Sequence, residues 1–220
     1  MTDQPSPQQD PRSVDELVNA ALTEQDEALA LDAVYALQWR GTAEVFERAL
    51  ALCRSQSPQE RQLGVEILAQ NDVQERQRVS ACREVLREMI TFEADADVIR
   101  SIITAFPFLD PEESVSFAIG QADHPSAQVR DGVVHVLMRY TSSGERPETS
   151  ARAVETLIAL TRDTNEKVRD WATFALATQT DIDTRVLRDA LAARLNDTCD
   201  DCRAEALCGL AERHDSRVLS

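Results

Sequence analysis

Arginine residues stand six positions after a polar turn residue in three segments of the chain. Asp163 precedes Arg169 and Asp197 precedes Arg203 at this spacing. A guanidinium fork binds a carboxylate through two parallel hydrogen bonds, so these arginines could bind an anionic ligand or could bond to the aspartates themselves. Because the sequence supplies carboxylates at the same spacing, we predict a structural ladder. Its residues are Asp163, Arg169, Asp197, Arg203 and Arg130.

Cys199 and Cys202 form a C-x-x-C pair, with Cys208 and His214 after them. Four such residues could hold zinc, and a thiol at a helix N-terminus could carry out redox chemistry. Helical spacing places Cys202 at a buried position and Cys208 more than one turn beyond it. No strand–helix–strand pattern surrounds the pair. We therefore predict small buried side chains here, with no metal ion and no cofactor.

Paired acidic residues such as Asp181 and Asp183 are common in the sequence, but no glycine-rich loop or nucleophile motif accompanies them. The three histidines form no His-Glu pair of the kind that binds iron in helical-repeat hydroxylases. We predict that the protein is not an enzyme.

Apolar residues recur three and four positions apart from Ser13 onward, which is typical of helices. One helix pattern repeats, and the position of Leu176 is also occupied by Leu37, Leu68, Phe106, Leu137 and Leu210. A leading helix precedes each copy. The six pairs are expected at 13–22 with 26–38, 43–54 with 57–70, 75–90 with 95–107, 111–121 with 125–140, 148–161 with 165–177, and 184–195 with 199–212.

A hairpin of two helices cannot bury its apolar stripe alone, so neighbouring hairpins must stack and share a core. We therefore predict an all-α fold, a right-handed α-solenoid of about six hairpins, in a single repeat domain over residues 13–220. Residues 1–12 are polar and rich in proline, and they are predicted to be a disordered tail.

The turn aspartate with an arginine six residues later resembles the HEAT repeat, and in particular the HEAT-like repeats of the phycobilisome-lyase type. The stretch from Asp163 to Val218 also resembles a group of bacterial HEAT-repeat proteins. The resemblance covers residues 24–216. It implies an armadillo-like α-solenoid whose successive repeats are joined by the ladder, and it suggests a cofactor-handling or lyase-like enzyme as an alternative function.

The net charge of the chain is −16, which repels nucleic acid phosphates and anionic membrane surfaces. No apolar run approaches the roughly 18 residues of a membrane span, and the first residues lack the pattern of a secretory signal. Five cysteines without such a signal indicate a reducing compartment. We expect a cytoplasmic monomer whose partner is a protein or peptide with a basic surface, and neither nucleic acid nor a membrane.

Apolar residues also fall at positions that a helical wheel predicts to be exposed, namely 173, 174 and their equivalents in the other repeats. They could line a concave groove for a partner, or the next hairpin could cover them. We predict a groove whose contacts are Tyr35, Ile103, Val134, His135, Phe174 and Leu207, with Arg100 and Asp131 on the flank. The predicted function is a non-catalytic protein-interaction scaffold or adaptor, with an acidic inhibitor or immunity-type protein as a further alternative.

Overall fold

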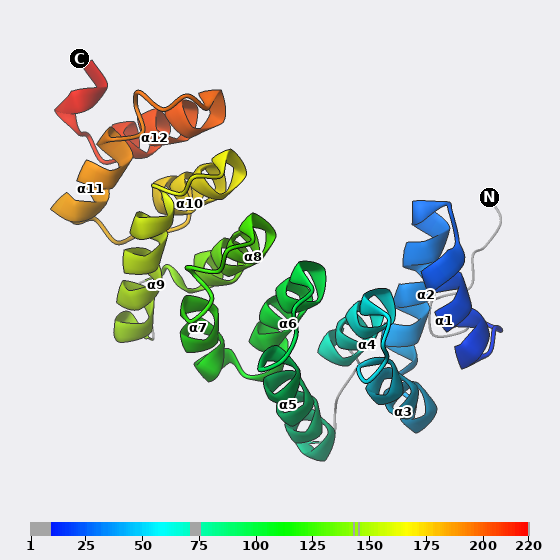
Figure 1. Cartoon of the computed structure of the whole chain (residues 1–220). Helices are drawn as coiled ribbons and strands as arrows, with labels where there is room; N and C mark the ends of the chain where they lie inside the picture. Colours follow the sequence, from blue (N-terminus) through cyan, green and yellow to red (C-terminus); the bar gives the residue numbers. More distant parts are fainter. Residues whose placement is uncertain (1–9, 71–75, 143, 145, 220) are drawn as a thin grey trace. The chain divides into compact units, whose positions relative to one another are not determined.

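The structure is a computed structural model, and it describes residues 10–70, 76–142, 144 and 146–219 of the 220-residue chain. Every regular element in these ranges is helical, and consecutive helices form hairpins (Figure 1). The chain divides into two compact units, residues 1–111 and residues 112–220. Each unit contains three hairpins.

The helices of the first unit are α1 (Val14–Thr23), α2 (Glu27–Arg40), α3 (Ala43–Leu52), α4 (Pro58–Gln70), α5 (Arg76–Ile90) and α6 (Ala96–Leu109). Those of the second unit are α7 (Pro111–Ile119), α8 (Ala127–Leu137), α9 (Pro147–Leu160), α10 (Glu166–Thr178), α11 (Arg185–Ala192) and α12 (Asp200–Glu212). A 3-10 turn, Met138–Tyr140, extends α8. All twelve helices coincide with predicted ones and differ only by a few residues at their ends.

The all-α repeat fold is therefore confirmed, and each unit is a stack of hairpins. A single domain over 13–220 stays a prediction. Residues 1–9 of the predicted tail lie outside the described residues. At the end of that segment, Arg40 donates a hydrogen bond of 2.8 Å to the carbonyl oxygen of Asp10, whose side chain pairs with Arg12 at 2.7 Å.

Polar side chains cap the helices where the sequence changes from turn to apolar periodicity. Ser13 and Glu16 form a reciprocal capping box at the start of α1. Asp26, Thr42, Asp95, Asn165 and Thr184 accept hydrogen bonds from first-turn amides of their own helices. These caps fix the point at which each helix begins, and so they fix the register of the repeats.

The second helices of the hairpins pack against one another within each unit. In the first unit α4 lies between α2 and α6, and in the second unit α10 lies between α8 and α12 (Figure 1). Their buried faces supply fully enclosed large side chains, including Leu37, Leu68, Phe106, Leu137 and Leu176. These are the repeated positions of the sequence, so the repeat is a repeat of core residues.

Gly64 and Gly209 allow two close approaches between helices. A Cβ atom at Gly209 of α12 would lie 2.7 Å from both the Cα and the Cβ of Ala177 in α10. A Cβ atom at Gly64 of α4 would lie 2.8 Å from the backbone nitrogen of Cys53, at the end of α3. Since no real Cβ atom fits at such distances, a larger residue would force these helices apart.

Two of the three arginines that we predicted in the ladder, Arg130 and Arg169, bind the aspartate of the following hairpin. Arg169 Nη2 lies 2.9 Å from Asp197 Oδ1 and its Nε lies 3.1 Å from Asp197 Oδ2. Arg130 makes the same fork to Asp163, at 2.6 and 2.8 Å. The third guanidinium nitrogen of Arg169 donates to the carbonyl oxygen of Asp163 at 3.0 Å, so one side chain ties its own turn to the next turn.

The structure adds one rung to the ladder. Arg61 holds Glu93 with two bonds of 2.7 and 2.9 Å, so a glutamate serves where the other rungs have aspartate. Arg203, which we also predicted as a ladder residue, pairs instead with Asp200 of its own helix. At the position of Arg169 the third hairpin has Ile99, and the fourth has His124 at the position of Asp163. The sequence thus omits both members of this rung together.

Arg169→Ala should reduce the free energy of unfolding by about 2 kcal/mol, because a nearly buried carboxylate loses its bidentate partner and keeps a single arginine bond, from Arg194. Asp197 is 4% exposed and Arg169 12% exposed. Arg203→Ala is the matched control, since it removes the same side chain from the same register, and it should cost about 1 kcal/mol or less. Urea denaturation followed by circular dichroism measures both. Equal losses in the two variants would contradict the ladder.

The ladder should also make stability depend on acid. The bidentate bond from Arg169 is the main reason that the pKa of Asp197 falls from 3.8 to about 2. The stabilisation is complete above the unfolded-state pKa of 3.8 and is lost as the pH falls toward 2. Between pH 5 and pH 2.5 the wild-type protein should therefore lose more stability than Asp197→Asn, which cannot titrate there. Parallel losses would show that other groups carry the acid dependence.

Candidate functional site

The second helices of each unit carry the residues that we predicted to line a groove. In the first unit Tyr35 is exposed and Arg100 is partly exposed, but Ile103 is completely buried. In the second unit Leu207 is 46% exposed, and His135 and Phe174 are partly exposed. Val134 is completely buried, and Asp131 is only 4% exposed.

The prediction that Ile103, Val134 and Asp131 line an open groove is therefore wrong. At the position of Thr173 in the repeat, Val65 and Thr173 are buried as well, whereas Leu207 of α12, the second helix of the last hairpin, is exposed. The helical wheel treats one helix in isolation and cannot show burial by the next hairpin. Position 174 points further from this contact, which leaves His135 and Phe174 accessible.

An aromatic cluster joins α8 and α10 on the accessible face of the second unit. The rings of His135 and Trp171 have centroids 4.9 Å apart, and Trp171 meets Phe174 edge to face at 5.6 Å. His135 Nδ1 donates to the carbonyl oxygen of Asp131 at 2.9 Å, which fixes the orientation of its ring. The sequence analysis did not select Trp171, although its position one turn before Phe174 places both on one helix face.

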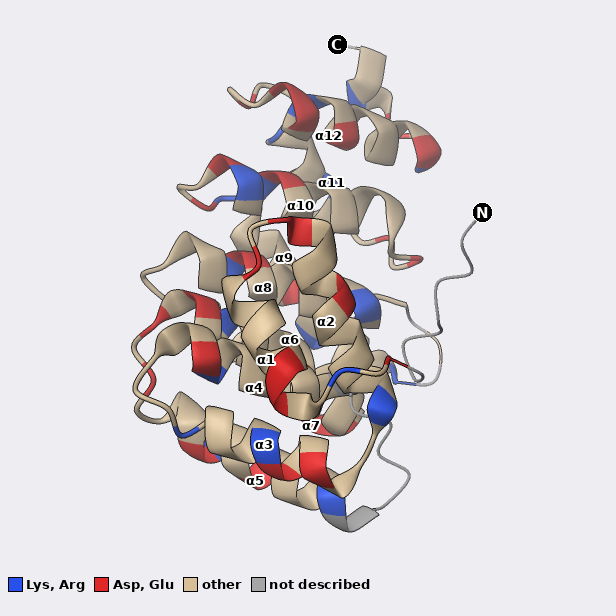
Figure 2. Ribbon diagram, turned by 90° about the vertical axis from the view of Figure 1, so that its right-hand side faces the viewer, with Lys and Arg blue, Asp and Glu red and all other residues tan. Residues whose placement is uncertain are grey.

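Carboxylates surround this aromatic cluster. Asp131 accepts an ion pair of 3.5 Å from Lys167, the only lysine of the chain. Burial, and then the charges of Asp201 and Glu166, raise the pKa of Asp170 on α10. Burial, and then the charges of Asp170 and Asp201, raise the pKa of Glu205 on α12. Figure 2 shows that the charged residues of α12 are mainly acidic. We call Asp170, Asp201 and Glu205 the acidic strip.

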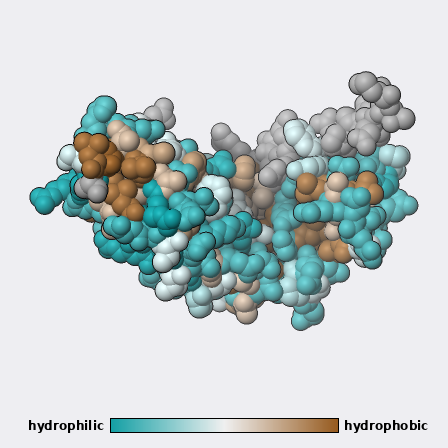
Figure 3. Space-filling model, turned by 90° about the horizontal axis from the view of Figure 1, so that it is seen from above, coloured by the Kyte–Doolittle hydropathy of each residue, from teal (hydrophilic) through white to brown (hydrophobic). Residues whose placement is uncertain are grey.

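No arginine or lysine among the described residues forms an ion pair with the acidic strip. The neighbouring arginine, Arg169, is held by Asp197, and Lys167 is held by Asp131. The strip therefore keeps its negative charge beside an aromatic surface. Leu207 of α12 is an exposed apolar side chain, as are Val186 of the leading helix α11 and Leu219 of the 3-10 turn that follows α12. Figure 3 shows hydrophobic patches among hydrophilic residues on the face that it presents.

Two pockets lie at equivalent positions in the two units, each beside a rung of the ladder. In the first unit a pocket of about 490 Å³ includes Arg61 and Glu93 in its wall. In the second unit a pocket of about 360 Å³ includes Arg130 and Asp163. The pockets therefore arise from the repeat itself, where one turn meets the leading helix of the next hairpin.

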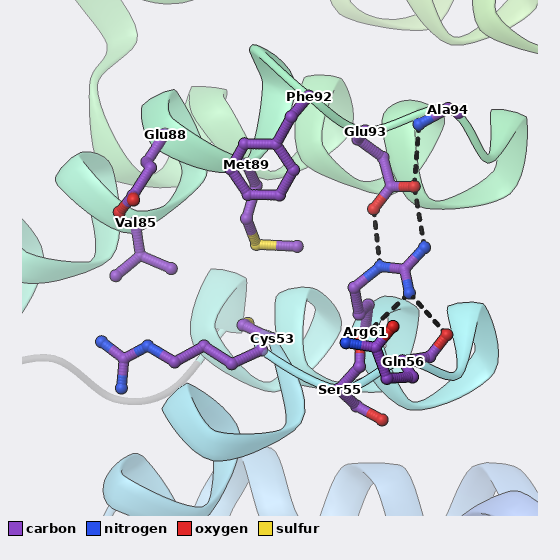
Figure 4. Close-up of a pocket in the computed structure, with 11 residues that line it drawn as sticks. Cys53, Ser55, Gln56, Arg61, Val85, Glu88, Met89, Phe92, Glu93 and Ala94 are labelled. Atoms are coloured by element: carbon purple, nitrogen blue, oxygen red, sulfur yellow. Dashed lines mark hydrogen bonds and ion pairs between the residues drawn. The ribbon is translucent and has the colours of Figure 1, made fainter.

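The pocket of the first unit has the more apolar wall. Val85, Met89 and the exposed Phe92 line it from α5 and the turn that follows, above Cys53 (Figure 4). Its counterpart in the second unit has Thr156, Ala159 and Arg162 at these positions. Burial raises the pKa of Cys53 to about 12, so this thiol has no nucleophilic character at neutral pH. The pocket offers apolar contact, and Arg61 and Glu93 in its wall are engaged in the rung.

The C-x-x-C pair is brought together with a third side chain. Cys199 caps α12, and its Sγ accepts a hydrogen bond of 3.3 Å from the amide of Cys202. Both cysteines are buried, as we predicted. Asp170 joins them, and one ligand atom from each residue lies within 4.8 Å of the others. Cys208 is exposed and does not belong to this group, nor does His214.

The repeat pattern matches a known family. Residues 83–177 match the family model described as HEAT repeats. This part of the chain is similar to HEAT repeats. This agrees with the repeat type predicted from the turn aspartate and the ladder arginine, while the phycobilisome-lyase subtype stays a prediction.

Protein YibA of Escherichia coli K12 is 42% identical to this chain over 64 residues, which are 29% of this chain and 22% of YibA. YibA of Escherichia coli O157:H7 gives the same values. The match therefore spans about a fifth of the length of these curated relatives. The X-ray structure of Escherichia coli YibA superposes with a TM-score of 0.79 at 25% identity, over 94% of this chain and 73% of that one.

A designed armadillo repeat protein in complex with the peptide (KR)4 has a TM-score of 0.52 and 14% identity, over 91% of this chain and 99% of that one. At this identity the likeness concerns the fold alone. Among the described residues, no helix is long and apolar enough to cross a membrane.

The distinction between core and accessible face can be tested directly. Val134→Asp should abolish cooperative unfolding or cost more than about 4 kcal/mol, because it buries a charge without a partner. Phe174→Asp is the matched variant, because it places the same charge at a partly exposed position of the second helix α10. It should reduce the free energy of unfolding by about 2 kcal/mol or less. Circular dichroism and urea denaturation measure both. If Phe174→Asp unfolds the protein as completely as Val134→Asp does, the aromatic cluster is part of the core.

Proposed function

We propose that this protein is a non-catalytic binding scaffold, and that the face formed by α8, α10 and α12 binds a segment of a partner protein that is rich in lysine or arginine. The observation that carries the proposal is the partly exposed cluster of His135, Trp171 and Phe174 beside the acidic strip. Aromatic faces attract cations through their quadrupoles, and carboxylates without a cation attract them by charge. The two features lie on the same face.

The ion pairs of the ladder support this proposal. Arg130 and Arg169 bind Asp163 and Asp197, so they do not neutralise the acidic residues on the face formed by α8, α10 and α12. A basic partner would supply the missing positive charge, and long-range attraction would speed the encounter. The designed armadillo repeat protein with a similar fold forms a complex with the peptide (KR)4, which supports a basic peptide as the ligand.

The lining of the face argues for an extended segment more than for a small molecule. The accessible groups are spread over three helices, from His135 on α8 through Trp171 on α10 to Leu207 on α12. An extended peptide can contact successive repeats in turn, with its basic side chains on the carboxylates and its backbone across the aromatic rings. Among the described residues of this face, no nucleophile is paired with a base, which agrees with a binding function.

The test uses the fluorescence of Trp171. The chain has two tryptophans, and Trp39→Phe leaves Trp171 as the single reporter. Titration with a capped octapeptide of alternating lysine and arginine should give a saturable change in emission. The apparent Kd should rise about tenfold or more between 50 and 300 mM NaCl, because exposed charges are screened. A capped octapeptide of alternating serine and glycine should give no change.

Variants locate the binding. Phe174→Ala and the double variant Asp201→Asn, Glu205→Gln should each weaken binding about tenfold, with little change in helix content. The matched control is Glu155→Gln, which removes one charge from an exposed position on α9. Equal weakening by Glu155→Gln would mean that net charge alone attracts the peptide, and an unresponsive Trp171 would place any binding elsewhere.

A further inference from the structure

We propose that Asp170, Cys199 and Cys202 form a binding site for a thiophilic divalent cation, with Zn²⁺ as the natural class of ligand. The site joins the fifth hairpin to the sixth, since Asp170 lies on α10 and the cysteines lie at the start of α12. One carboxylate oxygen and the two Sγ atoms all lie within 4.8 Å of one another. This proposal does not depend on the proposed function, because two of its three ligands lie outside the binding face.

The donor set selects the metal. Two thiolates with one carboxylate suit zinc and cadmium, whereas magnesium and calcium prefer oxygen ligands. Ligand atoms of a tetrahedral zinc site stand about 3.3–3.8 Å apart, given metal–ligand bonds of about 2.0–2.3 Å. The three donors would therefore have to close by about 1 Å at most, which side-chain rotation can supply.

A second observation points to a ligand at this place. Asp170 Oδ1 is buried and has no hydrogen-bond partner. A buried carboxylate oxygen without a hydrogen-bond partner is unfavourable, and more so when the group is charged. Of the other enclosed carboxylates on these helices and turns, Asp163 and Asp197 are held by arginine forks, and Asp131 pairs with Lys167. Among the described residues, Asp170 takes part in no such ion pair with an arginine or lysine.

The sequence around the cysteines fits the same conclusion. The repeats have Val129 and Val168 at the position of Cys202, so packing alone is satisfied by valine there. The amide of Cys202 donates to Cys199 Sγ, and a hydrogen bond to sulfur from a helix N-terminus stabilises a thiolate bound to a metal. Asp200 and Asp201, which stand between the two cysteines in the sequence, add negative charge that a dication would offset.

The experiment uses the full chain, stripped with a chelator and kept under a non-thiol reductant. Titration with Co²⁺ should give two kinds of absorption band: a thiolate-to-cobalt charge-transfer band in the near ultraviolet, and the d–d bands of a tetrahedral complex in the visible. Both should saturate at one equivalent. Zn²⁺ should displace Co²⁺ and abolish these bands. Zn²⁺ should also raise the thermal unfolding midpoint, because it binds the folded chain.

Three conservative variants test the ligands. Cys199→Ser keeps a helix cap, and Cys202→Val restores the residue type of the other repeats, so both should fold. Each should abolish the charge-transfer band, and Asp170→Asn should raise the Kd for Co²⁺ about tenfold or more. Cys208→Ser, an exposed cysteine of the same helix, is the matched control and should bind Co²⁺ as the wild type does.

Two results would overturn the proposal. The first is the absence of a thiolate charge-transfer band in the reduced wild-type protein at saturating Co²⁺. The second is a band that survives Cys199→Ser and Cys202→Val but disappears in Cys208→Ser, since this would place the metal on the surface of α12. In either case Cys199 is only a helix cap and Cys202 only a core residue.

Discussion

A hairpin of two short helices has an apolar face that it cannot bury by itself, and this constraint shapes both units of the protein. The second helix of each hairpin packs on the second helix of its neighbour, as α10 does between α8 and α12. The residues that meet there are small or apolar, and Gly209 brings α12 against Ala177 at a distance that no larger residue allows. A side chain at this contact, such as Thr173, is buried in the core. The side chain at the following position, Phe174, is partly exposed and available for binding.

The ladder is the polar counterpart of this packing. Apolar contact is tolerant of sliding, whereas a guanidinium fork with two bonds to one carboxylate has a single geometry. Arg61, Arg130 and Arg169 each reach the acidic residue of the next hairpin and also a carbonyl oxygen of their own turn. They fix the register of the stack. They also use positive charge that would otherwise lie beside the acidic residues of the second helices.

These two effects together give the second unit its chemical character. Packing leaves His135, Trp171 and Phe174 partly exposed, and the ladder leaves Asp170 and Glu205 without arginine partners. A surface that is both aromatic and acidic favours cationic ligands. Asp170 of the acidic strip lies beside the buried thiols of Cys199 and Cys202, and these three residues are the ligands of the proposed metal site.

The sequence by itself determined the helices, the pairing of helices into hairpins, and the ladder. Caps such as Ser13 and Asn165, apolar periodicity and the spacing from Asp163 to Arg169 are local or strictly repeated features, so one chain read in order contains them. Only the tertiary structure decided which apolar residues are accessible. Ile103 and Leu207 occupy the same position of the repeat, yet Ile103 is completely buried and Leu207 is exposed. Glu93 stands at the repeat position of Asp163, where we predicted a rung only for aspartate. Asp170 meets the cysteines only across two hairpins, and no repeated spacing shows this contact.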